Sequence, residues 1–223
     1  MPKGKAPEET TDYASPACFM HEVDPAYLGL PPHAADNVFE WRRAERERLI
    51  AARLGIPPEQ RKIAAERITF RLDKFLGDVR GKRIGVYWPF RGEPDLRQWM
   101  ESVWERGGSA LLPIVIEKAA PLIFKPWRQG EELGRGVWNI PIPIDGEAAT
   151  PDIVIAPVVG YDRSCFRLGY GGGYFDRTLA IMKPKPLAIG IGYDVQAIDT
   201  IHPQSFDVAM NVIITDTGIH HPS

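Results

Sequence analysis

The chain has 223 residues, a quarter of them charged and 44% hydrophobic, and this length suits one α/β domain with a substantial core. The formal net charge of −2 excludes a broad basic surface of the kind that holds nucleic acid or an anionic membrane, so any anion site must be local. Two widely separated cysteines and no secretory or membrane-spanning pattern lead us to expect a cytoplasmic protein that binds neither nucleic acid nor membrane.

Residues 1–35 are rich in proline and show no apolar period, so we expect an N-terminal extension that is partly disordered. Within it, Cys18, His21 and Glu22 offer a weak zinc-ligand pattern, and the alternative is an ordinary docking segment. The remaining residues, 36–223, show no internal repeat and are expected to form a single α/β domain.

Two helices are expected at the start of this domain. The first follows a capping aspartate at Asp36 and ends near Gly55, and the second begins near Pro58 and ends at Gly77. The apolar residues of the first helix that fall on roughly one face are Val38, Trp41, Leu49 and Ala52.

Short apolar segments alternate with helical patterns through the rest of the chain. The order strand, helix, strand over residues 83–116 is that of a βαβ unit with parallel strands. We therefore expect an α/β sheet with helices on both faces. The expected strands are 83–89, 109–116, 121–127, 152–159, 186–193 and 211–216, and the expected helices are 95–108 and 174–182.

The segment "RLGYGGGYFDR", residues 167–177, places four glycines within five positions. Such a run lets the backbone approach a ligand closely and turn several amides toward one anion, above all a phosphate at the start of a helix. The segment is neither a Walker A loop nor a Gly-x-Gly-x-x-Gly motif, because Tyr174 stands where the last glycine should be. The flanking Arg167 and Arg177 suit phosphate oxygens. The alternative is a tight structural turn.

Asp176 lies in the first turn of the helix that follows the glycines, where the helix dipole alone favours a carboxylate. Beside bound phosphate, the same carboxylate would need a cation, and Mg²⁺ held by one or two carboxylates has this arrangement. Asp207, just before a strand, is a candidate second carboxylate.

Arg42 and Arg46 stand four residues apart on the first helix, a spacing at which like charges repel. One interpretation is a solvated charged face, diluted by nearby glutamates. The other is a face that binds a polyphosphate.

The segment "YWPFRGEPD" places Trp88, Phe90 and Glu93 beyond the carboxyl end of a strand, where α/β sheets bind ligands. Aromatic rings there can enclose a flat heterocycle, and a carboxylate can accept its N–H donors. Trp88 by itself is equally compatible with a place in the core.

Taken together, "DIVIAPVVGYDRSCFRLGYGGGYFDR", "YWPFRGEPD" and the arginine helix resemble the 5-formyltetrahydrofolate cyclo-ligase family, from about residue 38 to the end of the chain. The resemblance implies a three-layer, Rossmann-like α/β/α fold. It also implies an ATP- and Mg²⁺-dependent reaction that converts 5-formyltetrahydrofolate to 5,10-methenyltetrahydrofolate, with ADP and phosphate released through a phosphorylated formyl intermediate. The partners would be small-molecule substrates, and the protein would be a monomer or a homodimer.

The resemblance also implies roles for individual residues. Arg167 and Tyr174 would be catalytic, Asp176 and Asp207 would hold the metal, and Gly160–Asp162 would form the turn before the loop. Substrate would contact Trp88, Glu93 and Tyr174. ATP would contact Arg42, Arg46, Arg167, Gly169, Tyr170, Gly171, Gly172, Gly173 and Tyr174.

Cys165 and Phe166 depart from the small or polar residues usual at these positions in the family. A paralogue that keeps ATP but acts on another formyl or amide compound would share the same motifs, as would a non-catalytic folate or nucleotide binder. A reactive thiol at Cys165 is a further alternative to simple packing.

Overall fold

The computed structural model describes residues 32–223, which begin with two helices, α1 (Pro32–Gly55) and α2 (Pro58–Leu76). Helix α2 confirms its expected signals, because Pro58 lies in its first turn and Gly77 ends it with a positive φ of 63°. Helix α1 starts before Asp36, so the predicted cap at that residue is wrong.

A seven-stranded sheet forms the centre of the molecule in the order β11-β10-β9-β6-β1-β2-β3. Its five central strands are parallel, and the two edge strands, β3 and β11, pair antiparallel. This arrangement confirms the mostly parallel α/β sheet. The strands are β1 (Arg83–Gly85), β2 (Ser109–Ile114), β3 (Ile123–Pro126), β6 (Ile153–Pro157), β9 (Leu187–Ile191), β10 (Val212–Ile214) and β11 (Ile219–His220).

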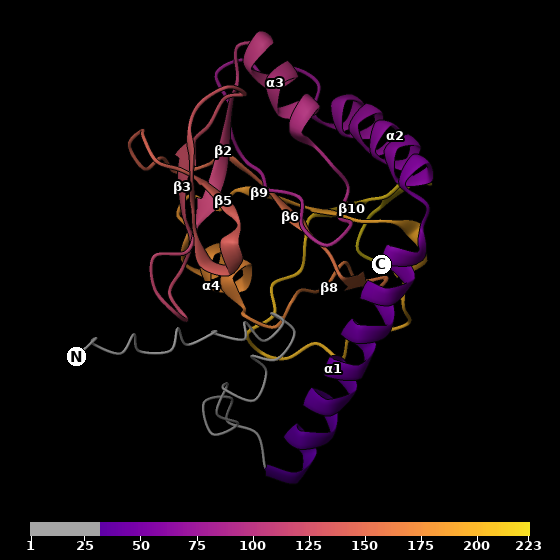
Figure 1. Ribbon diagram of the computed structural model, residues 1–223. Coiled ribbons are helices and arrows are strands. Elements are labelled where there is room, and N and C mark those ends of the chain that lie inside the picture. Colours follow the sequence, from indigo (N-terminus) through magenta and orange to yellow (C-terminus); the bar gives the residue numbers. More distant parts are fainter. Residues whose placement is uncertain (1–31) are drawn as a thin grey trace, which may run out of the picture.

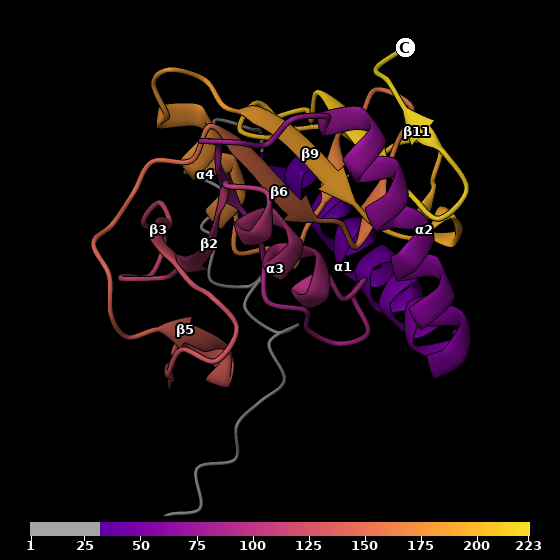
Figure 2. The same cartoon turned by 90° about the horizontal axis from the view of Figure 1, so that it is seen from above.

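Helices cover both faces of the sheet (Figures 1 and 2). Helix α2 and helix α3 (Arg97–Glu105) pack on one face, and α4 (Tyr174–Ile181) packs on the other. The three-layer α/β/α expectation is therefore confirmed. No helix within residues 32–223 is both long and apolar enough to span a membrane.

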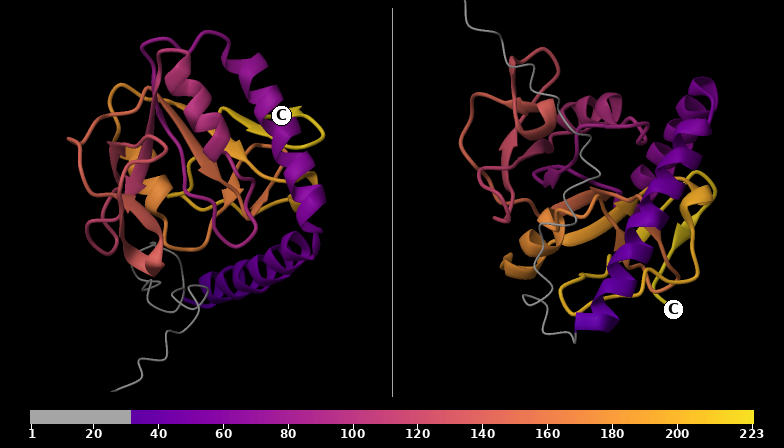
Figure 3. Two further views of the ribbon diagram at one scale, coloured as in Figure 1. Left: turned by 45° about the horizontal axis from the view of Figure 1, so that its top comes forward. Right: turned by 60° about the horizontal axis from the view of Figure 1, so that its bottom comes forward.

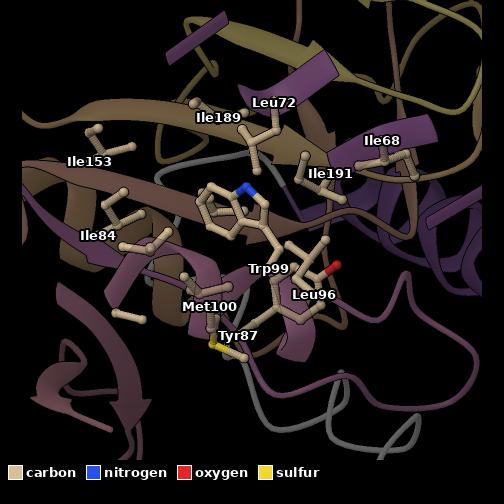
Figure 4. Packing of buried hydrophobic residues seen from close by; sticks show 14 of the residues in the cluster. Ile68, Leu72, Ile84, Tyr87, Leu96, Trp99, Met100, Ile153, Ile189 and Ile191 are labelled. Carbon is tan, nitrogen blue, oxygen red and sulfur yellow. The ribbon is translucent and has the colours of Figure 1, made fainter. Parts of the chain in front are cut away.

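The alternation of side chains along β6 builds both halves of the core. Ile153 and Ile155 pack with Trp99 of α3 on one face (Figure 4), whereas Val154 and Ala156 join the cluster that contains α4. A strand buried on both faces reads as a continuous apolar run, which is why its sequence predicted it well.

Several short elements were not expected from the sequence. They contain two or three residues each, too few to show a period. They are two antiparallel pairs, β4 (Leu133–Arg135) with β5 (Pro141–Pro143) and β7 (Gly160–Tyr161) with β8 (Arg167–Leu168), and two 3₁₀ turns, η3 (Val137–Asn139) and η4 (Asp194–Gln196).

Helix α1 lies across the sheet edge at which the parallel strands end (Figure 3). Leu49 and Ile50 pack against Val159, which follows β6, and against Leu168 of β8. The same face of α1 buries Arg42 and Arg53, at 3% and 0% exposure. The interpretation of Arg42 as part of a solvated face is therefore wrong.

Candidate functional site

A cavity opens at the point in the sheet where the order of the strands reverses. Strand β1 has β2 on one side and β6 on the other, so the connections after β1 and β6 leave in opposite directions and a crevice forms at their carboxyl ends. The cavity encloses about 930 Å³ when the open solvent at its mouth is counted. The segment after β1, the glycine loop and the β4–β5 connection all line it. Among its lining residues are Trp88, Phe90, Glu93, Trp138, Arg167, Gly169, Tyr170, Gly172, Gly173, Tyr174 and Asp176.

The glycine loop, residues 169–173, joins β8 to the first turn of α4. Gly171 and Gly173 have φ angles of 101° and 62°, in the region that favours glycine. Within the described part of the chain, no hydrogen bond has the backbone N–H of Gly171, Gly172 or Gly173 as donor. These amides are thus available for an anion at the start of a helix.

Asp162 fixes the turn that leads into this loop. Its buried carboxylate accepts hydrogen bonds from the backbone N–H groups of Ser164 and Phe166, both at 3.1 Å, and of Ile201 at 3.1 Å. The turn before the loop is therefore held to the segment after β9.

Arg167 and Asp176 both line the cavity and form a bidentate ion pair. Nη1 and Nη2 of Arg167 donate to the two carboxylate oxygens at 2.9 and 3.1 Å. The Asp176 carboxylate also accepts the backbone N–H of Val208 at 3.1 Å. A predicted phosphate ligand and a predicted metal ligand are thus brought together.

Arg42 and Asp207 form a second buried pair, in which both side chains are less than 10% exposed. Arg42 also donates to the carbonyl oxygens of Ile201 at 3.0 Å and His202 at 2.9 Å. Asp207 does not line the cavity, unlike Asp176. Across residues 32–223, no three His, Cys, Asp or Glu side chains gather as a metal-ligand cluster. Metal binding by either aspartate stays a prediction.

Arg46 connects α1 directly to the glycine loop. Its Nε donates to the carbonyl oxygen of Gly169 at 2.6 Å. Burial, and then repulsion from Arg42, lower the pKa of Arg46 to about 10. An added anion would therefore stabilise the charged form of Arg46.

Glu93 lines the same cavity and has one carboxylate oxygen without a hydrogen-bond partner among residues 32–223. Its Oε2 accepts the backbone N–H of Phe90 at 2.9 Å, while its buried Oε1 has no hydrogen-bond partner within the described chain. Burial raises the pKa of Glu93 to about 7. A buried acceptor without a partner is costly, so a ligand N–H at this position would be favoured.

Aromatic rings line the same cavity. Trp88 lines the cavity and lies edge-on to Trp127, with 5.3 Å between ring centroids, so it contributes to both the core and the site. Tyr174, at the start of α4, faces Trp138 at 6.1 Å. Such rings suit a flat heterocycle.

The sequence reasoning missed Arg53 and Trp138. Arg53 follows Arg42 by eleven residues, about three helical turns, so the same spacing argument could have placed both on one face. Trp138 lies in a connection with a φ of 58°, and no periodic signal indicates its position.

The minor alternatives have different outcomes. Cys165 is buried, its thiol donates to the carbonyl oxygen of His220, and burial raises its pKa, all of which oppose a reactive thiolate. The zinc pattern at Cys18, His21 and Glu22 lies outside the described residues.

Together, the fold and the cavity define an α/β protein with a cavity at a topological switch point, bordered by Arg167 and by glycine-loop amides that have no hydrogen-bond acceptor within residues 32–223. A family model described as the 5-formyltetrahydrofolate cyclo-ligase family matches residues 38–216. The chain belongs to this family and is an enzyme.

Relatives with similar sequences carry the name of this family, and a solved structure has the same fold. The chain is 26% identical to the 5-formyltetrahydrofolate cyclo-ligase of Escherichia coli K12 over 75% of this chain and 96% of that protein. It is 30% identical to the Mycolicibacterium smegmatis protein of the same name, over 76% and 91%. The NMR structure of the Aquifex aeolicus 5,10-methenyltetrahydrofolate synthetase superposes with a TM-score of 0.71 at 24% identity, covering 81% of this chain and 92% of that one, and shows the same fold.

We expect Arg42→Ala to lower the free energy of unfolding by about 3–5 kcal/mol, because it leaves the buried Asp207 carboxylate without its cation. Arg43→Ala is the matched control, since Arg43 is exposed on the same helix, and we expect a change within about 0.5 kcal/mol. Urea unfolding followed by tryptophan fluorescence measures both. Equal effects of the two substitutions would contradict the structural role of the pair.

Proposed function

We propose that this chain is an ATP- and Mg²⁺-dependent 5-formyltetrahydrofolate cyclo-ligase that forms 5,10-methenyltetrahydrofolate, ADP and phosphate. The observation that carries the proposal is one cavity lined by two chemically different sets of groups. Glu93 and Trp88 offer a carboxylate and a ring surface to a heterocycle, and the glycine loop offers amides and Arg167 to a phosphate. The names of the relatives supply the substrate class that suits both sets.

The reaction requires the formyl oxygen to become a leaving group. In the proposed first step, this oxygen attacks the γ-phosphorus of ATP, the bond to the bridging oxygen breaks, and ADP leaves with a phosphorylated imidate remaining. N10 then attacks the imidate carbon and closes the ring, and phosphate departs with the N10 proton. Catalysis of such a transfer consists mainly of positioning and charge stabilisation.

The residues of the cavity can perform those tasks. The loop amides and Arg167 would bind the transferring phosphoryl group and stabilise its developing charge. Tyr174 lies at the start of α4, between the loop and Trp138, where its ring would orient the folate beside the phosphate. Arg46 would add positive charge from α1 beside the glycine loop. Arg42 would contribute from the same helix while it remains paired with Asp207.

Asp176 fits a role in Mg²⁺ binding, because it is the aspartate that lines the cavity and a single carboxylate with phosphate oxygens and waters is a common Mg²⁺ environment. The ion would neutralise charge on the triphosphate. Its carboxylate would then exchange part of its pairing with Arg167, which would become available to phosphate.

The direct test mixes the purified protein with ATP, Mg²⁺ and 5-formyltetrahydrofolate and follows the near-ultraviolet absorbance of the methenyl product. We expect a rise that depends on both ATP and folate, with one ADP formed for each product molecule. ADP formation without the absorbance would indicate another substrate, and binding without ADP would indicate a non-catalytic binder; either result rejects the proposed reaction.

We expect Asp176→Asn to raise the KM for Mg²⁺-ATP by roughly tenfold or more while 5-formyltetrahydrofolate binding changes little, because the substitution removes a negative oxygen from the proposed phosphate site. Steady-state kinetics and folate binding without ATP separate the two effects. Asp152→Asn is the control, since Asp152 forms an exposed pair with Arg83 far along the sheet from the cavity. Equal loss of folate and nucleotide binding would contradict the assignment of Asp176.

A further inference from the structure

Arg53 is fully buried and contacts two residues that line the cavity, Tyr170 and Glu93. Its Nη2 donates to the hydroxyl oxygen of Tyr170 in the glycine loop at 2.5 Å, and its Nη1 lies 4.0 Å from Oε1 of Glu93. Two further bonds, to the carbonyl oxygens of Arg91 at 3.1 Å and Val158 at 3.3 Å, fix the guanidinium in place.

We propose that Arg53 is a positioning residue that acts through Glu93: its fixed guanidinium directs the carboxylate oxygen that lacks a hydrogen-bond partner within residues 32–223 at the N–H groups of the bound folate. This inference rests on the proposed function. Arg53 has no exposed surface and is absent from the residues that line the cavity, so it would not contact the substrate itself. Its second bond, to Tyr170, would hold the glycine loop at a fixed distance from Glu93.

Arg53 opposes the effect of burial on the pKa of Glu93. Burial raises the pKa of Glu93 to about 7, and attraction to Arg53 is the largest influence that lowers it. Among residues 32–223, the hydroxyls of Tyr87, Tyr170 and Tyr193 also interact with Glu93, and burial raises the pKa of each. These hydroxyls therefore stay neutral over the range in which Glu93 titrates. The hydroxyl of Tyr170 lowers the pKa of Glu93 further.

Folding raises the pKa of Glu93 to about 7, so ionisation of Glu93 lowers the free energy of unfolding. The protein regains this free energy as pH falls below about 7 and Glu93 becomes protonated. Folate N–H donors need the ionised form. Folate affinity should therefore rise as pH increases through about 7 and level off above it.

The experiment measures binding of 5-formyltetrahydrofolate without ATP by quenching of tryptophan fluorescence, from about pH 5.5 to about pH 8.5. We expect the wild-type protein to gain roughly tenfold in affinity per pH unit below the midpoint, and Glu93→Gln to bind weakly with little pH dependence. Arg53→Lys keeps the charge but loses the planar fork, so we expect the pH dependence to persist with affinity reduced about threefold to tenfold.

A double variant makes the result decisive even where Arg53→Lys does not fold. Arg53→Met with Glu93→Gln removes both buried charges together, which a protein core tolerates better than the loss of one partner. Because Arg53 acts through Glu93, we expect this variant to bind folate within about twofold of Glu93→Gln alone. Affinity at least about tenfold weaker than that of Glu93→Gln would overturn the inference.

Arg48→Lys is the matched control, because Arg48 is exposed on the same helix and pairs with Glu45. We expect it to bind folate like the wild-type protein. Since no ATP is present, turnover does not enter the measurement. If the affinity of the wild-type protein for folate does not change with pH, the inference about Arg53 is wrong and the proposed reaction is unaffected. If binding depends on pH but no methenyl product forms in the activity assay, the proposed reaction is wrong and the inference about Arg53 is unaffected.

Discussion

Burial of arginine dominates the construction of this site. A guanidinium is stable inside a protein only when carboxylates or carbonyl oxygens compensate its charge. Helix α1 buries Arg42, Arg46 and Arg53 against the loops at the carboxyl edge of the sheet. Arg42 bonds the chain before Asp207, Arg46 bonds the glycine loop, and Arg53 bonds the glycine loop and the segments after β1 and β6. One helix thus fixes the relative positions of loops that are far apart in sequence.

The same pairing leaves the part of the cavity beside the glycine loop suited to an anion. Arg42 pairs with Asp207 and Arg167 pairs with Asp176, and the charges of Arg42 and of both aspartates affect the pKa of Arg46. Burial and the neighbouring Arg42 lower that pKa, so an added anion would stabilise the charged form of Arg46. In the proposed function, a triphosphate with Mg²⁺ would supply this anion, and the amides of the glycine loop would orient it.

Much of the fold could be predicted because it depends on local patterns. Pro58 and Gly77 delimit α2, and the apolar run of β6 marks a strand that is buried on both faces. The place of the glycine loop and of Glu93 in the lining of the cavity could also be predicted, because both follow apolar segments that the sequence marks as strands, and ligands bind beyond the carboxyl ends of such strands. The pairing of Arg42 with Asp207 could not be predicted, since it joins residues 165 positions apart that only the packing of α1 brings together. The β4–β5 pair and the 3₁₀ turn that contains Trp138 are too short and irregular to show a periodic pattern in the sequence.

The most direct test of the account is a crystal structure of the protein with a non-hydrolysable ATP analogue and Mg²⁺. The account predicts that phosphate oxygens accept hydrogen bonds from the backbone N–H groups of Gly171–Gly173, with the metal beside Asp176. A nucleotide bound elsewhere, with the glycine loop closed by its own side chains, would contradict it.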